Sequence, residues 1–191
     1  MVTPIFDLRP GRVRSARASG AESECLRYRL DVVGGSAVDV VQSTGGWLYD
    51  RVMAGWEVTV LLPHGGDPRS LRILGVGVSD LRSLDGTDAA SHGLAVSAEA
   101  FTADARVRDR VRKSLDSRLT EVALWGRPLH GWPLGPGRAL TRAQHILSAA
   151  ARTFKGHALG ADGIDCDSVD PTETLWCDPR SPVDSQLVRL D

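Results

Sequence analysis

The sequence predicts an α+β fold, with a mixed or largely antiparallel sheet of five strands covered by about three helices. Segments with apolar residues at every second position, typical of strands, alternate with segments whose apolar residues lie three and four apart, typical of helices. The strand segments keep polar residues between apolar ones, whereas strands buried on both faces of a parallel sheet are apolar throughout. A doubly wound α/β sheet is the alternative, because a strand, a Gly-Gly-Ser turn and a helix come first, as they do in such folds.

The first two elements are a strand over 26–32 and a helix over 36–55. Apolar and polar residues alternate in the strand, which predicts one buried and one solvated face. The apolar residues of the helix fall at helical spacing, and a glycine follows its last turn. Two further glycines, Gly45 and Gly46, interrupt its middle. Each costs about 1 kcal/mol relative to alanine, so we expect a kink or a close helix contact there.

The middle of the chain predicts two strands that pair as a hairpin, over 56–62 and 71–78. The first is rich in β-branched residues, which favour strands. The segment 63–68 between them contains two prolines and two glycines and is expected to turn. A fourth strand is expected over 93–101.

The second half of the globular part begins with a helix over 104–118, whose apolar residues lie four apart on one face. A strand over 120–125 follows. The segment 126–137 contains three prolines and is expected to be an irregular loop. A capping pattern then predicts a helix over 141–155.

Charge divides the chain into a basic N-terminal arm over 1–24, a single globular domain over 25–158 and an acidic, loosely ordered tail over 159–191. The formal net charge of the whole chain is −1, yet from residue 156 onward eight acidic residues face only two basic ones. Such an asymmetry indicates a solvated acidic tail on a basic body, and it would also allow the tail to shield a basic face.

The chain has three cysteines, Cys25, Cys166 and Cys177. A small and odd number of cysteines argues against a disulfide framework and indicates a reducing compartment. The first residues contain no apolar stretch of the kind that signal peptides carry. No run approaches the 18 or more apolar residues that a membrane span needs. We therefore expect a cytoplasmic protein without a membrane partner, and the preference for arginine over lysine indicates a GC-rich bacterial genome.

Two turns could carry chemistry. Gly34, Gly35 and Ser36 lie where a strand meets a helix, and free backbone N–H groups there favour anions, although the spacing of a nucleotide-binding motif is missing. His64 and Asp67 could form an acid–base pair, although a simple hairpin turn explains the same residues. Structural glycines are the simpler interpretation of the first turn as well.

No metal site and no cofactor are expected. His157, Cys166 and Cys177 are the residues that could bind a metal in the C-terminal part, but eight and ten residues separate them. Structural zinc sites instead use closely spaced pairs of ligands, because a short turn fixes two ligands at once.

Basic residues of the arm and of the helix over 104–118 could together follow a phosphate backbone. The candidate nucleic-acid contacts are Arg12, Arg14, Arg17, Arg106, Arg110 and Lys113. Aromatic residues that could stack on bases are scarce, which favours an ordinary solvated helix face.

Tryptophans in loops often anchor protein interfaces, and they also often cover the edge of a core. The candidate partner contacts are Trp125, His130, Trp132 and Trp176.

These observations favour a non-catalytic regulatory or protein-interaction module with a protein partner, because no nucleophile, metal or phosphate motif has the required spacing. One alternative is a small-molecule or nucleotide-binding enzyme that uses Gly34, Gly35, Ser36 and His64. The other is a nucleic-acid-binding protein that uses the arginine-rich arm and helix. The sequence does not define an oligomeric state.

Overall fold

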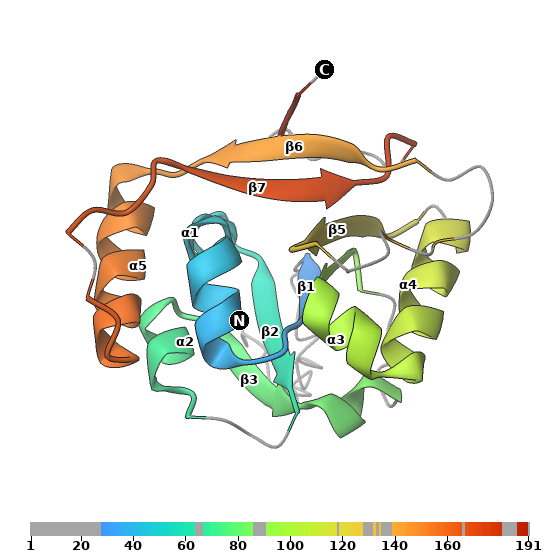
Figure 1. Ribbon diagram of the computed structural model, residues 1–191, viewed down its shortest axis with the longest axis horizontal. Helices are drawn as coiled ribbons and strands as arrows, with labels where there is room; N and C mark the ends of the chain where they lie inside the picture. The colour runs from blue at the N-terminus through green and yellow to red at the C-terminus, as the bar shows by residue number, and fades with distance from the viewer. Residues whose placement is uncertain are drawn as a thin grey trace, which may run out of the picture.

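The computed structural model describes residues 28–63, 67–85, 91–117, 119–127, 132, 134, 139–165, 167–180 and 187–190. Within these ranges, one sheet of eight strands has the order β3-β2-β1-β4-β5-β7-β6-β8. Figure 1 shows this sheet with helices on both of its faces. The molecule is therefore a three-layer α/β structure.

The first five strands run parallel to one another. They are β1 (Arg29–Val33), β2 (Glu57–Leu62), β3 (Gly77–Asp80), β4 (Gly93–Ser97) and β5 (Glu121–Trp125). Their order is that of the first five strands of a doubly wound sheet: the chain moves from β1 through β2 to β3 on one side and then from β4 to β5 on the other.

Three antiparallel strands extend the sheet beyond β5. They are β6 (Thr141–Ile146), β7 (Thr172–Cys177) and β8 (Val188–Arg189). Strand β7 pairs with both β5 and β6, so the C-terminal segment completes the sheet.

Helices α1 (Ala37–Met53), α2 (Arg69–Ile73) and α5 (Ala149–Ala161) pack against one another on one face of the sheet. Helices α3 (Ala98–Ala103) and α4 (Ala105–Ser117) and the short 3₁₀ helix η1 (Leu81–Asp85) cover the other face. Each layer buries its own apolar cluster, one around Trp47 and Leu48 and one around Phe101 and Val111. Figure 1 shows the two groups of helices on opposite sides.

The prediction of a five-stranded, mixed or largely antiparallel sheet with about three helices is wrong. Strand β1 contributed to this error. The buried Asp31 lies between Leu30 and Val32, and in the sequence this alternation predicts a solvated face that the strand does not have. The arrangement kept as the alternative, a doubly wound sheet, describes the first five strands.

The predicted hairpin is also wrong. The segment assigned to a third strand over 71–78 begins as helix α2, in which Leu71 is fully buried, and only then forms β3. Strand β3 pairs with β2 in parallel, so the segment between them is a crossover with a short helix and not a turn.

The helix expected over 141–155 is a strand followed by a helix. Its first part forms β6, in which Ala143 and His145 are buried at every second position. Helix α5 starts later: Ser148 is its N-cap, and its Oγ accepts a hydrogen bond of 3.0 Å from the backbone N–H of Ala151. The predicted capping pattern at Thr141 is therefore wrong, because Thr141 lies in β6 and the helix is capped seven residues later, by Ser148.

The expectation of a loosely ordered tail over 159–191 does not hold for strand β7. Leu175 in this strand is fully buried, and the acidic Glu173 beside it is buried as well. The prediction from charge missed this strand, because such a prediction assumes that charged side chains are solvated. The division into arm, domain and tail otherwise stays a prediction, since residues 1–27 lie outside the described residues.

No helix in the described part of the chain is both long and apolar enough to cross a bilayer. The cytoplasmic location stays a prediction.

Candidate functional site

The carboxyl ends of the parallel strands form the edge at which open α/β sheets bind ligands, and the binding crevice lies where the strand order reverses. Here that point lies between β1 and β4. Gly34 and Gly35 follow β1, Ser97 ends β4 and Trp125 ends β5. Residues at these strand ends are therefore the candidates to act on a ligand.

Ser36 and Asp39 form the start of helix α1. The Ser36 side chain caps the helix by accepting a hydrogen bond of 3.1 Å from the backbone N–H of Asp39. The Asp39 carboxylate in turn accepts hydrogen bonds from the backbone N–H of Gly35 and the hydroxyl of Ser43, both at 3.4 Å. A carboxylate in the first turn is stabilised by the positive end of the helix dipole. Local contacts thus hold Asp39 at the turn that follows β1.

Trp125 also holds Asp39, but from a distant part of the chain. Its indole Nε1 donates a hydrogen bond of 3.1 Å to Oδ1 of Asp39. Trp125 is 1% exposed, so the donor comes from a rigid, buried side chain. The Asp39 carboxylate therefore has a fixed orientation between α1 and β5.

Glu99 is the second carboxylate of the site. Ser97 caps α3 by accepting a hydrogen bond of 3.0 Å from the backbone N–H of Ala100, and Glu99 lies in the first turn of this helix. Its side chain lies against Gly35, where an added Cβ would overlap the Glu99 carboxyl group. A larger residue at position 35 would therefore displace the Glu99 carboxyl group from this turn.

Asp39 and Glu99 thus both contact Gly35, one through a hydrogen bond and one through packing. Neither carboxylate forms an ion pair with any residue that the structure describes. The site is therefore negatively charged. Carboxylates in such a setting can accept a proton from water or attract a positively charged group.

The predicted anion site falls at the same turn, on Gly34, Gly35 and Ser36. The Gly35 N–H donates to the Asp39 carboxylate, and Glu99 adds a second negative charge beside it. These contacts favour a neutral or positively charged ligand over an anion at this turn. Anion binding itself stays a prediction.

The structure describes only one residue of the predicted acid–base pair. His64 lies outside the described residues, whereas Asp67 is exposed and accepts a hydrogen bond of 2.9 Å from the backbone N–H of Arg69 at the start of α2. A side chain that satisfies a helix start in this way has a structural role. A catalytic role for the pair stays untested.

Two of the candidate partner contacts pack within the molecule. Trp132 lies edge to face with Phe101, with 5.2 Å between the ring centroids. Trp176 is a half-buried residue of β7, and the Arg142 guanidinium lies 5.9 Å from its ring centroid. Trp125 is buried against Asp39, and His130 lies outside the described residues.

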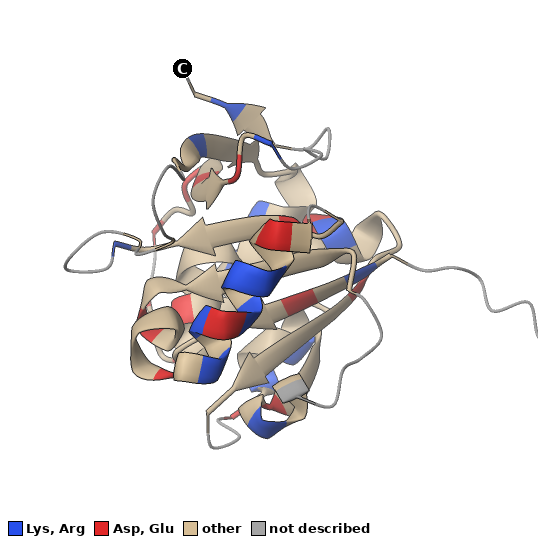
Figure 2. Ribbon diagram, turned by 90° about the vertical axis from the view of Figure 1, so that its right-hand side faces the viewer, with Lys and Arg blue, Asp and Glu red and all other residues tan. Residues whose placement is uncertain are grey.

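The basic residues of α4 are mixed with acidic ones, and both signs lie along this helix in Figure 2. Arg106 pairs with Asp104 at 2.7 Å, and its hydrogen bond lowers the pKa of the Asp104 carboxyl. Arg110 is half-buried and Lys113 is exposed. The remaining nucleic-acid candidates, Arg12, Arg14 and Arg17, lie outside the described residues.

Among the described residues, no three side chains of histidine, cysteine, aspartate or glutamate come together as metal ligands. His145 is bound to Asp50, with 2.8 Å between Nε2 and Oδ2, and His157 lies on α5. Cys177 is a buried free thiol whose pKa burial raises to about 12. Cys166 lies outside the described residues.

Sequence reasoning missed Glu99 and the contact of Trp125 with Asp39. The start of α3 could have been found, because Ser97 directly follows an apolar stretch and precedes a glutamate, as N-caps do. The approach of Glu99 to Gly35 and of Trp125 to Asp39 had no local signal, because each joins elements distant in the chain.

No family model matches the sequence, and comparison with curated proteins found no match. Solved structures are similar in fold. The A40926 pseudoaglycone deacetylase Dbv21 superposes with a TM-score of 0.56 and 15% identity over 83% of this chain and 100% of its own. A deacetylase in complex with teicoplanin, from the teicoplanin biosynthesis pathway, gives a TM-score of 0.55 and 15% identity over 85% and 99%. The zinc-inhibited form of the teicoplanin deacetylase Orf2 gives 0.55 and 13% over the same shares.

This likeness corrects the functional expectation. Proteins that share the fold over nearly their whole length are deacetylases, and deacetylases are enzymes. The expectation of a non-catalytic regulatory or protein-interaction module is therefore wrong. A protein partner stays an untested prediction.

The zinc in one of these structures prompts a test of the donor set here. Zinc sites in proteins are made mainly of histidine and cysteine, with carboxylates in addition. The described residues at the switch point offer two carboxylates and the Ser36 hydroxyl, and no described histidine or cysteine joins them. This set does not fit a zinc ion. At their level of identity, the solved structures show that this chain has a deacetylase-like fold.

Proposed function

We propose that this protein is a hydrolase that removes an acyl group from the nitrogen of a small, polar molecule at the carboxyl edge of its parallel strands. The observation that carries the proposal is the pair of carboxylates, Asp39 and Glu99, that meet at Gly35 on the switch point. The likeness to deacetylases over 99–100% of their length supports the reaction class.

The two carboxylates differ in how they are held, and this gives them different roles. Hydrogen bonds from Trp125, Ser43 and Gly35 hold the Asp39 carboxylate in place. Glu99 is exposed, and no hydrogen bond from a described residue occupies its carboxylate. Glu99 is therefore the carboxylate free to exchange protons with water, and Asp39 is the fixed negative charge.

In the reaction, the Glu99 carboxylate takes a proton from water as the water oxygen attacks the carbonyl carbon of the amide. The carbon–nitrogen bond then breaks, and the proton passes from Glu99 to the leaving nitrogen. The products are a carboxylic acid and a free amine, so atoms and charge balance. The first backbone N–H groups of α1, at Ala37 and Val38, lack intrahelical acceptors and can stabilise the negative charge on the carbonyl oxygen.

The charge of the site also indicates the substrate. The amine product is a cation at neutral pH, and two carboxylates that form no ion pair with a described residue attract it. Acylated amino sugars and other acylated amines have this property. The solved deacetylases are named for A40926 pseudoaglycone and for the teicoplanin biosynthesis pathway, which makes these two compounds suitable first substrates.

The test is release of amine by the purified full-length protein. The substrates are N-acetylglucosamine, simple N-acetylated primary amines, A40926 pseudoaglycone and teicoplanin, and the products are measured as free primary amine and free acid. We expect Glu99→Gln to lower kcat/KM by roughly a hundredfold or more, the usual contribution of a general base. Asp39→Asn should also lower it, because the fixed charge is lost.

Glu57→Gln is the matched control, since Glu57 is an exposed glutamate at the start of β2, on the opposite edge of the sheet. It should leave amine release unchanged. If the wild-type protein releases no amine from any substrate at stoichiometric enzyme concentration, or if Glu99→Gln retains full activity, the proposal is wrong.

A further inference from the structure

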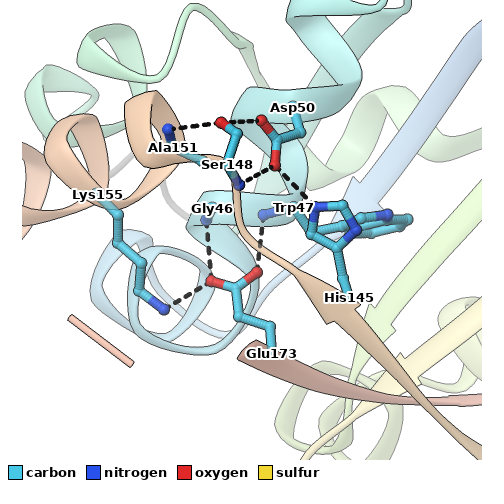
Figure 3. Close-up of polar contacts among 8 residues, drawn as sticks. All are labelled: Gly46, Trp47, Asp50, His145, Ser148, Ala151, Lys155 and Glu173. Atoms are coloured by element: carbon cyan, nitrogen blue, oxygen red, sulfur yellow. Dashed lines mark hydrogen bonds and ion pairs between the residues drawn. The ribbon is translucent and has the colours of Figure 1, made fainter. Parts of the chain in front are cut away.

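Side chains from β7 and α5 enter the hydrogen-bond pattern in the middle of helix α1 (Figure 3). The Glu173 carboxylate accepts the backbone N–H of Gly46 at 2.9 Å and that of Trp47 at 2.8 Å. In a regular α-helix these N–H groups donate to the carbonyls four residues earlier, at Gln42 and Ser43. Two successive turns of α1 are therefore linked through a side chain of another element.

Lys155 completes this exchange from the opposite direction. Its Nζ donates a hydrogen bond of 2.7 Å to the Gln42 carbonyl and forms an ion pair of 2.6 Å with Oε1 of Glu173. Lysine and glutamate side chains are 7% and 3% exposed, so both charges are buried. Burial raises the pKa of the Glu173 carboxyl, and Lys155 with the two N–H groups acts in the opposite direction. The pair thus bridges the donors and the acceptor that α1 leaves at this point.

Glycines make this arrangement sterically possible. A Cβ added at Gly46 would overlap the side chain of Leu147, so β6 and α1 could not approach as closely with any other residue. The neighbouring Gly45 contacts Leu74 and Lys155. Two successive glycines lower the intrinsic stability of a helix by about 2 kcal/mol in total relative to alanine. The helix is therefore locally weakest where it depends on Glu173 and Lys155.

A second polar cluster lies one turn further along α1 and connects to β6 and to the start of α5 (Figure 3). The Asp50 carboxylate bonds to His145 Nε2 at 2.8 Å and accepts the Ser148 hydroxyl at 2.6 Å and the Ser148 N–H at 3.1 Å. Histidine and serine both bind the aspartate, so the arrangement differs from a Ser-His-Asp triad, in which histidine lies between the other two. Unlike Glu173, Asp50 does not bond to the backbone of α1. It provides a matched control from the same helix.

We infer that Gly45 and Gly46 form a hinge in α1, and that the buried Lys155–Glu173 pair holds this hinge closed. When the pair is broken, the amino-terminal half of α1 moves separately from the carboxyl-terminal half. That mobile half carries Ser36 and Asp39, so the hinge sets the geometry of the candidate site. The hinge itself does not depend on the proposed hydrolase activity; only its consequence for catalysis does.

A purely structural ion pair makes a different prediction. If Lys155 and Glu173 only stabilise the fold, breaking the pair lowers the free energy of unfolding, and every amide that exchanges by global unfolding exchanges faster by the same factor. A hinge instead increases local opening. Amides of one half of α1 then exchange faster, while those of the remaining core keep their rates.

The experiment is native-state hydrogen exchange of the full-length protein, followed residue by residue, for the wild type and for Glu173→Gln. We expect amides over 40–44 to exchange roughly tenfold faster or more in the variant, with those over 48–52 and in β1 and β4 unchanged. Because Glu173→Gln leaves the Lys155 charge buried without its partner, this variant could fail to fold. The double variant Lys155→Met, Glu173→Gln removes both charges and gives the same local prediction.

Asp50→Asn is the control. It breaks the neighbouring cluster without changing the backbone contacts of α1, and it should leave the ratio of exchange rates between the two halves of the helix unchanged. The hinge is refuted if amides over 40–44 keep their wild-type rates in the folded variants, or if all core amides accelerate by one common factor. Loss of hydrolase activity is not needed for either result.

Discussion

The indole Nε1 of Trp125 donates a 3.1 Å hydrogen bond to the carboxylate of Asp39. This bond joins the end of β5 to the first turn of α1, across the intervening strand β4 and beside Glu99 of α3. The orientation of one candidate catalytic carboxylate thus depends on a residue from the far side of the switch point. The contact leads to the first of four predictions.

Replacing Trp125 by phenylalanine should keep most of the packing and remove only the hydrogen bond to Asp39. We expect the free energy of unfolding to fall by about 1–3 kcal/mol, because a half-buried charged acceptor loses a donor and the smaller ring leaves space in the core. Urea unfolding measures this loss. Trp176→Phe is the control, since no carboxylate among the described residues accepts a hydrogen bond from its indole; an equal or larger loss there would contradict the specific role of Trp125.

Gly46→Ala should destabilise the protein by about 1–3 kcal/mol, because the added Cβ overlaps Leu147 and the buried Glu173 contact must shift. Gly160→Ala in α5 is the matched control, since nothing lies within 4 Å of its added Cβ. That substitution should stabilise the helix by about 0.5–1 kcal/mol. Thermal unfolding should therefore shift in opposite directions for the two variants, and equal shifts would show that the close contact at Gly46 is unimportant.

Arg51→Lys should be costly although the charge is kept. The Arg51 side chain is fully buried, and its Nη2 lies 3.0 and 3.1 Å from the two carboxylate oxygens of Glu121. Its guanidinium carbon also lies 4.3 Å from the centroid of the Trp56 ring and 5.1 Å from that of the Trp47 ring. Lysine cannot reproduce the planar stacking or the fork of donors. We expect a loss of roughly 2–4 kcal/mol in urea unfolding. Arg112→Lys, at an exposed pair on α4, should change stability by less than about 0.5 kcal/mol.

Cys177 should resist alkylation in the folded protein at pH 8 to 9. Burial raises the pKa of this thiol to about 12 from an ordinary value of 9.0, so the reactive thiolate is absent. The unfolded chain ionises this thiol first, so the stability that it contributes is complete below pH 9 and is lost as the pH rises toward 12. Mass spectrometry after iodoacetamide treatment checks the first point. Labelling of Cys177 at the same rate in native and urea-unfolded protein would disprove it.

The sequence located several elements well. The strand expected over 26–32 and the helix expected over 36–55 are β1 and α1, and the helix over 104–118 is α4. The two helices each have one solvated side, so their local pattern reports their structure. Gly55 after α1 is a further local signal, because its φ of 91° is a conformation that glycine adopts without strain.

Buried charges caused the main errors. Asp31 made a central parallel strand look half-solvated, and Glu173 made an interior strand look like a solvated tail. The Asp31 case is pronounced, since its Oδ2 is buried without a hydrogen-bond partner among the described residues. A charged residue is normally evidence of exposure, and that inference fails wherever a partner from elsewhere in the fold, as Lys155 is for Glu173, permits burial.

Periodicity along the chain by itself located α1, β2, α4 and β5, because that pattern reflects which side of each segment meets water. Over 71–78 and 141–155 one expected element is a helix and a strand, and only the tertiary structure decided which residues form which. Only the tertiary structure decided which strands are neighbours, and with it that the fold is a parallel sheet extended by three antiparallel strands. The same packing brings Glu99 against Gly35, Trp125 against Asp39 and Glu173 into the middle of α1. These contacts join residues far apart in sequence, and their energies depend on burial and exact approach, which no local pattern encodes.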